Sequence, residues 1–186
     1  MRVISGEYRG RRLKALEGNN TRPTTDKVKE SIYNMIGPYF DGGRVLDLFA
    51  GSGALGIEAL SRGMNQAVFV DRHFGAIKII KQNIALIRAE NKSHVLKMDA
   101  NQAIDYLKND QAFDLILLDP PYATQEIEEQ LEHLYQAKLI AEGAIIVCET
   151  DASIHLKEQI ASLVQTKRVV YGHTAVTIYR HEVYDA

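Results

Sequence analysis

The sequence predicts an α/β fold in which a seven-stranded, mostly parallel sheet carries helices on both faces and ends in an antiparallel hairpin. Two observations support this fold class. From Arg44 onward, short apolar runs alternate with longer segments of helical periodicity, and repeated β–α units of this kind build a parallel sheet. The last two runs, 168–172 and 175–181, alternate as strands do and lie too close together for a crossover, so we expect them to pair as a hairpin.

The elements follow one another without an internal repeat or a linker, so we expect a single domain over residues 1–186. Residues 1–40 provide a basic N-terminal arm with one helix, and residues 41–186 provide the core. In the arm, we expect a strand–turn–strand over about 1–20 and a helix over about 26–37, which Thr24 or Thr25 can cap. The core strands are expected at 44–49, 66–70, 94–98, 113–118 and 143–149. The core helices are expected at 54–61, 74–89, 101–107, 127–134 and about 153–164.

The composition excludes several classes of protein. A length of 186 residues with 46% apolar residues suits one globular core. The single cysteine, Cys148, excludes a disulfide framework, and the six histidines lack the spacing of metal ligands, so we expect no metal site. No apolar stretch reaches the roughly 20 residues that cross a bilayer, and no signal peptide is visible. A cytoplasmic protein without membrane contact is therefore expected.

Positive charge is concentrated at the N-terminus. Residues 1–29 hold eight Lys or Arg residues and three acids, whereas the remainder holds 14 basic and 21 acidic residues. A basic arm on an acidic body favours a polyanionic partner such as nucleic acid, although a solvated charged terminus gives the same pattern. The candidates for phosphate contacts are Arg9, Arg11, Arg12, Lys14 and Arg22.

The segment Asp119-Pro120-Pro121-Tyr122 directly follows the apolar run 113–118. Two prolines cannot continue a strand, so a rigid turn presents Asp119 and Tyr122 at its carboxyl end, where ligands bind in open α/β sheets. A carboxylate, a proline carbonyl and an aromatic ring suit a flat base that bears an amino group. The alternative is a surface loop that happens to contain two prolines.

A glycine-rich turn follows the strand expected at 44–49. Gly51 and Gly53 allow a ligand to approach the backbone, and with Gly56 they fit G-x-G-x-x-G, a pattern also found in dinucleotide-binding proteins. Asp47 argues against NAD, because a carboxylate close to the turn repels a pyrophosphate and attracts an ammonium group. NAD binding would also leave Asp119-Pro120-Pro121-Tyr122 without a role.

Two further acids end consecutive strands beside this turn. Asp71 can accept both hydroxyls of a ribose, and Asp99 can accept a hydrogen bond from an adenine amino group. Each of them can instead cap the helix that follows. Together with Asp47 they describe a pocket for an ammonium group, a ribose and an adenine, which S-adenosylmethionine combines with a transferable methyl group.

At this point the chain resembles the class I S-adenosylmethionine-dependent methyltransferases, which have a Rossmann-like fold, and more narrowly the RsmD-type guanine-N2 methyltransferases of bacterial 16S rRNA. The resemblance covers nearly the whole chain and rests on residues 1–13, 22–30, 47–56 and 119–122. It implies S-adenosylmethionine as cofactor and a guanine of 16S rRNA as substrate, on assembled or partly assembled small-subunit particles. It also implies catalytic roles for Asp119, Pro120, Pro121 and Tyr122. The cofactor contacts that it implies are Thr24, Thr25, Asp47, Phe49, Gly51, Ser52, Gly53, Asp71, Arg72, Asp99 and Ala100.

In this interpretation, Asp119 and the carbonyl of Pro120 hold the amine and Tyr122 stacks on the base, so positioning supplies most of the rate. A monomer is expected. Three alternatives stay open: an amino-methyltransferase acting on DNA adenine or protein glutamine, an NAD-dependent oxidoreductase, and an RNA-binding module without catalysis.

Overall fold

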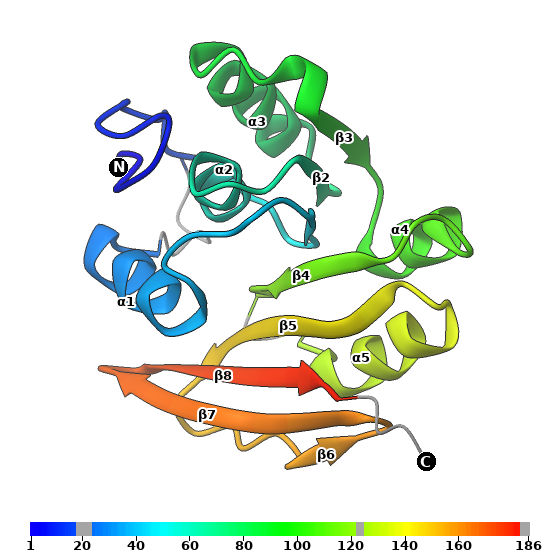
Figure 1. The fold of residues 1–186 in the computed structure, drawn as a ribbon. Helices are drawn as coiled ribbons and strands as arrows, with labels where there is room; N and C mark the ends of the chain where they lie inside the picture. The colour runs from blue at the N-terminus through cyan, green and yellow to red at the C-terminus, as the bar shows by residue number, and fades with distance from the viewer. Residues whose placement is uncertain (18–23, 122–124, 183–186) are drawn as a thin grey trace.

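The computed structural model describes residues 1–17, 24–121 and 125–182, which form one eight-stranded sheet flanked by helices (Figure 1). The strand order is β3-β2-β1-β4-β5-β8-β7-β6, parallel from β3 to β5 and antiparallel from there on. The strands are β1 (Arg44–Asp47), β2 (Gln66–Asp71), β3 (Ser93–Lys97), β4 (Phe113–Leu118), β5 (Ile140–Asp151), β6 (Gln159–Ile160), β7 (Leu163–Tyr171) and β8 (Thr174–His181). The helices are α1 (Asp26–Ile36), α2 (Ala54–Ser61), α3 (Phe74–Leu86), α4 (Ala100–Leu107), α5 (Ile127–Gln136) and the 3₁₀ turn η1 (Glu90–Lys92).

Two apolar layers, one on each face of the sheet, hold the fold together. Alternate residues of a strand point to opposite faces, so Val45 faces one layer and Leu46 the other. The first layer contains the buried sides of α1, α2 and α3, and the second contains those of α4 and α5. This double coverage explains why β1 and β4 are buried along nearly their whole length.

The predicted order of strands and helices is confirmed over most of the core. The helix predicted at 54–61 and the strand predicted at 113–118 coincide with α2 and β4. The C-terminal hairpin is confirmed as β7 and β8, which pair antiparallel from Leu163↔His181 to Tyr171↔Thr174.

The helix predicted at about 153–164 is wrong. The segment instead contains β6 and the start of β7, which form a short hairpin through Ile160↔Leu163. The buried residues Leu156, Ile160 and Leu163 are spaced four and three apart and therefore imitate a helix face. Pairing with β8 outweighs that local periodicity, and β6 raises the number of strands from the predicted seven to eight.

The first part of the N-terminal arm, residues 1–17, is folded against the core. The predicted strand–turn–strand is reduced to one antiparallel bridge between Arg2 and Arg12. The arm buries Val3, Tyr8 and Leu13 in the same apolar layer as α2 and α3. The basic segment is thus a fixed part of the domain.

Two features are absent from residues 1–17, 24–121 and 125–182. Among these residues, no helix combines the length and the apolar character needed to cross a membrane. Within the same ranges, no group of three or more His, Cys, Asp or Glu side chains is arranged to hold a metal ion.

Candidate active site

The glycine loop, residues 48–53, lies at the carboxyl end of β1, between β2 and β4. The Leu48 amide donates to the Leu117 carbonyl (3.1 Å) and the Ala50 amide donates to the Val70 carbonyl (2.9 Å), so both neighbouring strands hold the loop. Gly53 is the N-cap of α2 and has a left-handed φ of 83°, which other residues rarely adopt. The loop therefore delivers the chain directly into a helix N-terminus, where backbone amides favour negatively charged groups.

The third glycine of the motif allows α2 to lie close to the sheet. A Cβ atom on Gly56 would stand 2.5 Å from Cε1 of Phe69, a fully buried ring of β2. We expect Gly56→Ala to lower the free energy of unfolding by about 1–3 kcal/mol, because the ring must shift within a packed core. Urea unfolding measures this loss. Gly75→Ala is the matched control: a Cβ there meets nothing within 4 Å, so alanine should leave stability unchanged or raise it, and equal losses in both variants would contradict the packing role.

Asp71, at the end of β2, holds the glycine loop. One carboxylate oxygen accepts from the Gly51 amide (2.9 Å), and the other accepts from the His73 amide (3.0 Å). The carboxylate therefore fixes both the loop and the turn into α3. Its free lone pairs are available to a ribose, and that contact stays a prediction. The neighbouring Arg72 is exposed and donates to the His73 ring (3.4 Å).

Asp99 caps α4, as one of the two sequence-based interpretations expected. Its Oδ1 accepts from the Gln102 amide (2.8 Å), and the Gln102 side chain accepts from the Asp99 amide (3.3 Å), which completes a capping box. Ala100 follows as a buried residue of α4. The adenine contact proposed for Asp99 stays a prediction that involves its second carboxylate oxygen.

Asp47 is buried behind the glycine loop, and its Oδ2 accepts from the Gly56 amide (3.1 Å). Burial raises the pKa of Asp47 to about 7, the Gly56 hydrogen bond opposes that rise, and the carboxylates of Asp71 and Glu149 add to it. The predicted contact of Asp47 with an ammonium group stays a prediction; such a cation would favour the ionised carboxylate and lower its pKa.

The raised pKa of Asp47 predicts a pH dependence of stability. Between its ordinary value of 3.8 and about 7, the folded protein keeps a proton that the unfolded chain releases. The contribution of this proton to the free energy of unfolding is thus complete below about pH 4 and is lost as the pH rises through about 7. Its upper bound is on the order of 4 kcal/mol. Asp47→Asn keeps an acceptor for Gly56 but does not titrate. We expect the unfolding free energy of this variant to lack the decline. If urea unfolding gives the wild type and the variant superimposable pH profiles, the raised pKa of Asp47 is refuted.

The Asp-Pro-Pro segment leaves β4 at the same edge of the sheet. Asp119 follows Leu118, which pairs with Cys148 of β5, and is partly buried. Pro120 is buried and Pro121 is exposed. Because β4 pairs with β1 up to Asp47↔Leu117 and with β5 up to Leu118↔Cys148, Asp119 leaves the sheet between the glycine loop and the end of β5. Tyr122 lies outside the described residues.

Glu149 is a candidate site residue that the sequence analysis missed. It is buried in β5, and both its carboxylate oxygens accept from the Thr24 hydroxyl, each at 3.2 Å. Thr25, not Thr24, caps α1, through its hydroxyl and the Val28 amide (3.2 Å). Glu149 could have been noticed as an acid that ends the apolar run 144–148.

The N-terminal arm reaches the glycine loop through Asn83 of α3, a fully buried residue. Its Oδ1 accepts from the Lys14 amide (2.7 Å), and its Nδ2 donates to the carbonyls of Lys14 (2.9 Å) and Ser52 (2.9 Å). Arg9, Arg11, Arg12 and Lys14 are exposed, and Arg22 lies outside the described residues. The structure thus joins the arm to the glycine loop at Lys14, whereas Arg11 donates to the Leu86 carbonyl at the far end of α3.

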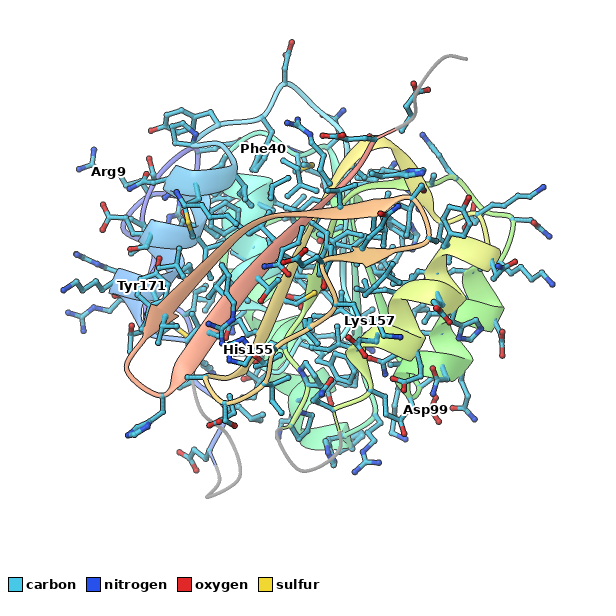
Figure 2. The ribbon with its side chains drawn as sticks, turned by 90° about the horizontal axis from the view of Figure 1, so that it is seen from below. Arg9, Phe40, Asp99, His155, Lys157 and Tyr171 are labelled. Carbon is cyan, nitrogen blue, oxygen red and sulfur yellow. The ribbon has the colours of Figure 1, made fainter. Side chains whose placement is uncertain are left out.

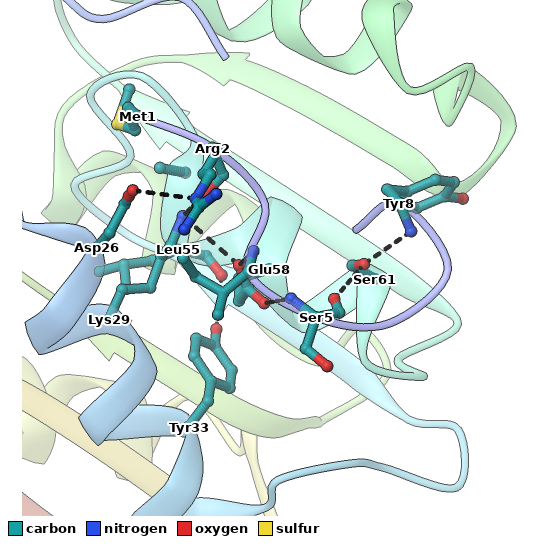
Figure 3. Close-up of polar contacts among 12 residues, drawn as sticks. Met1, Arg2, Ser5, Tyr8, Asp26, Lys29, Tyr33, Leu55, Glu58 and Ser61 are labelled. Carbon is teal, nitrogen blue, oxygen red and sulfur yellow. Dashed lines mark hydrogen bonds and ion pairs between the residues drawn. The ribbon is translucent and has the colours of Figure 1, made fainter. Parts of the chain in front are cut away.

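A second buried cluster anchors the arm on α1 and α2 (Figure 3). The Glu58 carboxylate accepts from the amides of Ile4 (2.9 Å) and Ser5 (3.1 Å) and from Nε of Arg62 (2.7 Å). Lys29 lies 3.5 Å from the same carboxylate and donates to the Arg2 carbonyl (2.6 Å). Burial lowers the pKa of Lys29, and Glu58 opposes that change. Glu58, Lys29 and Arg62 are all essentially inaccessible to solvent.

This combination of fold and site defines a class of protein. The strand order 3-2-1-4-5 with an antiparallel strand beyond it, the glycine loop after β1, the acid that ends β2 and the Asp-Pro-Pro turn after β4 are the features of a class I methyltransferase. The chain belongs to the family described as Conserved hypothetical protein 95, the RsmD-type family, whose sequence model matches residues 1–180.

Individual relatives agree with this assignment. The Bacillus subtilis (strain 168) protein YlbH, provisionally named an rRNA methyltransferase, is 50% identical over 181 residues, which cover 97% of this chain and 98% of that protein. Ribosomal RNA small subunit methyltransferase D of Escherichia coli (strain K12) is 30% identical over 182 residues, covering 98% of this chain and 90% of that protein. The solved structure of the Escherichia coli protein yhhF, provisionally named a methyltransferase, superimposes with a TM-score of 0.85 at 30% identity and covers 98% of each chain.

Proposed function

We propose that this chain transfers a methyl group from S-adenosylmethionine to the exocyclic N2 amine of a guanine in 16S rRNA of the small ribosomal subunit. The observation that carries the proposal is the position of Asp119-Pro120-Pro121, directly after β4, the strand whose Leu117 carbonyl holds the glycine loop. The names of the Escherichia coli and Bacillus subtilis relatives support rRNA as the substrate class.

The residues around the glycine loop fit S-adenosylmethionine. The cofactor carries an ammonium group and a sulfonium, and the carboxylates of Asp47, Asp71 and Glu149 lie close enough together for two of them to raise the pKa of the third. A cationic ligand relieves that repulsion. The proposed contacts are the ammonium with Asp47, the ribose with Asp71, the adenine with Asp99, and the remainder with Thr24, Thr25, Phe49, Gly51, Ser52, Gly53, Arg72 and Ala100.

Asp119 and Pro120 are proposed to orient the amine. An exocyclic amine is a weak nucleophile because its lone pair is delocalised into the ring. Hydrogen bonds from its two N–H groups to the Asp119 carboxylate and the Pro120 carbonyl aim that lone pair, and stacking on Tyr122 fixes the plane of the base. When bound, the cofactor supplies an electrophilic methyl group, and the protein contributes positioning and electrostatics.

The basic residues Arg9, Arg11, Arg12, Lys14 and Arg22 are proposed to hold rRNA phosphates. Phosphate contacts give affinity and orientation, whereas the choice of base comes from the site itself. A base in an RNA loop can be splayed into such a site without opening a duplex. We propose that the chain acts as a monomer on assembled or partly assembled small-subunit particles.

A methyl-transfer experiment tests this proposal. Small-subunit particles and naked 16S rRNA, both from a strain that lacks the gene, are incubated with the protein and tritiated S-adenosylmethionine, and the labelled nucleoside is identified after nuclease digestion. We expect label in N2-methylguanosine at one position. Cofactor binding without label in RNA would overturn the proposal, and the same incubation with DNA or with protein in place of RNA would then distinguish the other substrates.

A further inference from the structure

Helix α3 has three distinct sides. Ala76, Ile77, Ile80 and Ile84 are buried against the sheet. Gln82, Asn83 and Leu86 contact the N-terminal arm, since Lys14 bonds Gln82 and Asn83 and Arg11 donates to the Leu86 carbonyl (3.3 Å). The third side carries the exposed residues Phe74, Lys78, Lys81 and Ala85, spaced four, three and four apart as a single stripe requires. We call these four residues the free face of α3.

The free face and the N-terminal arm together carry the positive charge of the molecule. Residues 72–89 contain four Lys or Arg residues and no acid, and residues 1–17 contain five Lys or Arg residues and two acids. The rest of the chain holds 13 basic and 22 acidic residues. Because α3 and the arm are joined by the hydrogen bonds of Lys14 and Arg11, these two basic segments lie side by side on the same face of the sheet (Figure 1).

Phe74 lies at the end of the free face that adjoins the candidate site. It is the first residue of α3, and the Asp71 carboxylate accepts from the amide of the residue before it. Its side chain is 72% exposed, which is costly for an aromatic ring that has no partner in solution. A single exposed apolar residue needs no explanation, but an aromatic ring that ends a lysine stripe beside a base-modifying site has the composition of single-stranded nucleic-acid surfaces.

We propose that the free face of α3 extends the rRNA-binding surface of the arm up to the active site. Lys78 and Lys81 bind backbone phosphates, and Phe74 stacks on an unpaired base that flanks the target guanine. This inference rests on the proposed function for its choice of RNA as partner. It adds to that function a path for the strand, from the arm along α3 to the carboxyl edge of β2.

Two variants test the inference by equilibrium binding to a radiolabelled 16S rRNA transcript over a series of KCl concentrations. For Lys78→Ala/Lys81→Ala, we expect weaker binding and a plot of log K against log [KCl] that is shallower by about 1–2, because each lost phosphate contact on a single strand removes about 0.7 from the slope. For Phe74→Ala, we expect about tenfold weaker binding with an unchanged slope, since stacking does not release counterions. Both variants should bind S-adenosylmethionine as the wild type does.

A matched control is Lys157→Ala/Lys167→Ala, which removes two exposed lysines at the opposite end of the sheet, near β6 and β7. Figure 2 shows Lys157 far from Arg9 of the arm. The control should bind RNA like the wild type. Equal slopes for Lys78→Ala/Lys81→Ala and the control would overturn the phosphate role, and a loss of cofactor affinity in Phe74→Ala would assign the ring to the cofactor.

RNA binding by the α3 variants and methyl transfer by the wild type can fail independently of each other. Methyl transfer by the wild type to small-subunit particles is measured independently of the variants. If the wild type labels RNA but the α3 variants bind it normally, only the inference fails. If the wild type labels DNA or protein instead, the proposed substrate fails first, and the variants are then compared on that polymer.

Discussion

Asp119→Ala should lower kcat for methyl transfer by about 100- to 1,000-fold while leaving the Kd for S-adenosylmethionine nearly unchanged. The alanine removes the acceptor proposed for the amine, and removing one preorganised group from an active site has an effect of that size. The cofactor contacts proposed here belong to other strands and to the glycine loop, so binding should survive. Single-turnover transfer of tritium measures the first quantity, and calorimetric titration of the cofactor measures the second.

Two companion variants sharpen this prediction. Asp119→Asn keeps a carbonyl acceptor and removes the charge, so substantial residual activity would mean that orientation of the amine matters more than acceptance of its proton. Asp110→Ala removes an exposed carboxylate from the loop before β4 and should behave as the wild type does. An Asp119→Ala protein that transfers methyl groups at the wild-type rate would remove the central support for the proposed function.

Glu58→Ala should lower the free energy of unfolding by about 3–5 kcal/mol, which is the usual cost of leaving a buried charge without its partner. Glu58 is fully buried and holds Lys29, Arg62 and two amides of the arm. Without Glu58, the pKa of Lys29 loses a contribution that raises it, and its ammonium group becomes harder to keep charged. Urea unfolding at neutral pH measures the loss.

The exposed Glu30 of α1 offers the comparison, because Glu30→Ala should change stability by no more than about 0.5 kcal/mol. Limited proteolysis adds a local readout, since trypsin cleaves after the arginines of an unfolded arm faster than after those of a folded one. A Glu58→Ala protein that loses less than about 1 kcal/mol and keeps its arm protected would show that apolar contacts alone hold the arm.

Local patterns account for what the sequence could predict. Alternating apolar runs located the strands of the parallel sheet, and the glycines and prolines located the two turns at its carboxyl edge. The same reliance on local spacing placed a helix where β6 and β7 begin, because the apolar residues there happen to follow a helical period. Whether such a segment becomes helix or strand depends on its partner β8, which the segment itself does not encode.

Long-range partners account for what the sequence missed. Glu149 pairs with Thr24 across 125 positions, Asn83 pairs with Lys14 across 69, and Glu58 pairs with Ile4 across 54. In the sequence these three residues look like an ordinary strand end and ordinary helix positions. Their roles arise only when folding brings the N-terminal arm against α2 and α3. For the same reason Asp71 could be assigned to a ligand, while its bonds to Gly51 and His73 could not be foreseen.

The amide group of Asn83 has a thermodynamic consequence. Its nitrogen donates one hydrogen bond to the Ser52 carbonyl in the glycine loop and another to the Lys14 carbonyl in the basic arm. A ligand that shifts either carbonyl therefore changes the energy of the other hydrogen bond. Linkage requires such an influence to be mutual: whatever the cofactor does to the affinity for RNA, RNA does by the same factor to the affinity for the cofactor. Under the proposed function, one buried side chain therefore links the cofactor site to the RNA-binding arm.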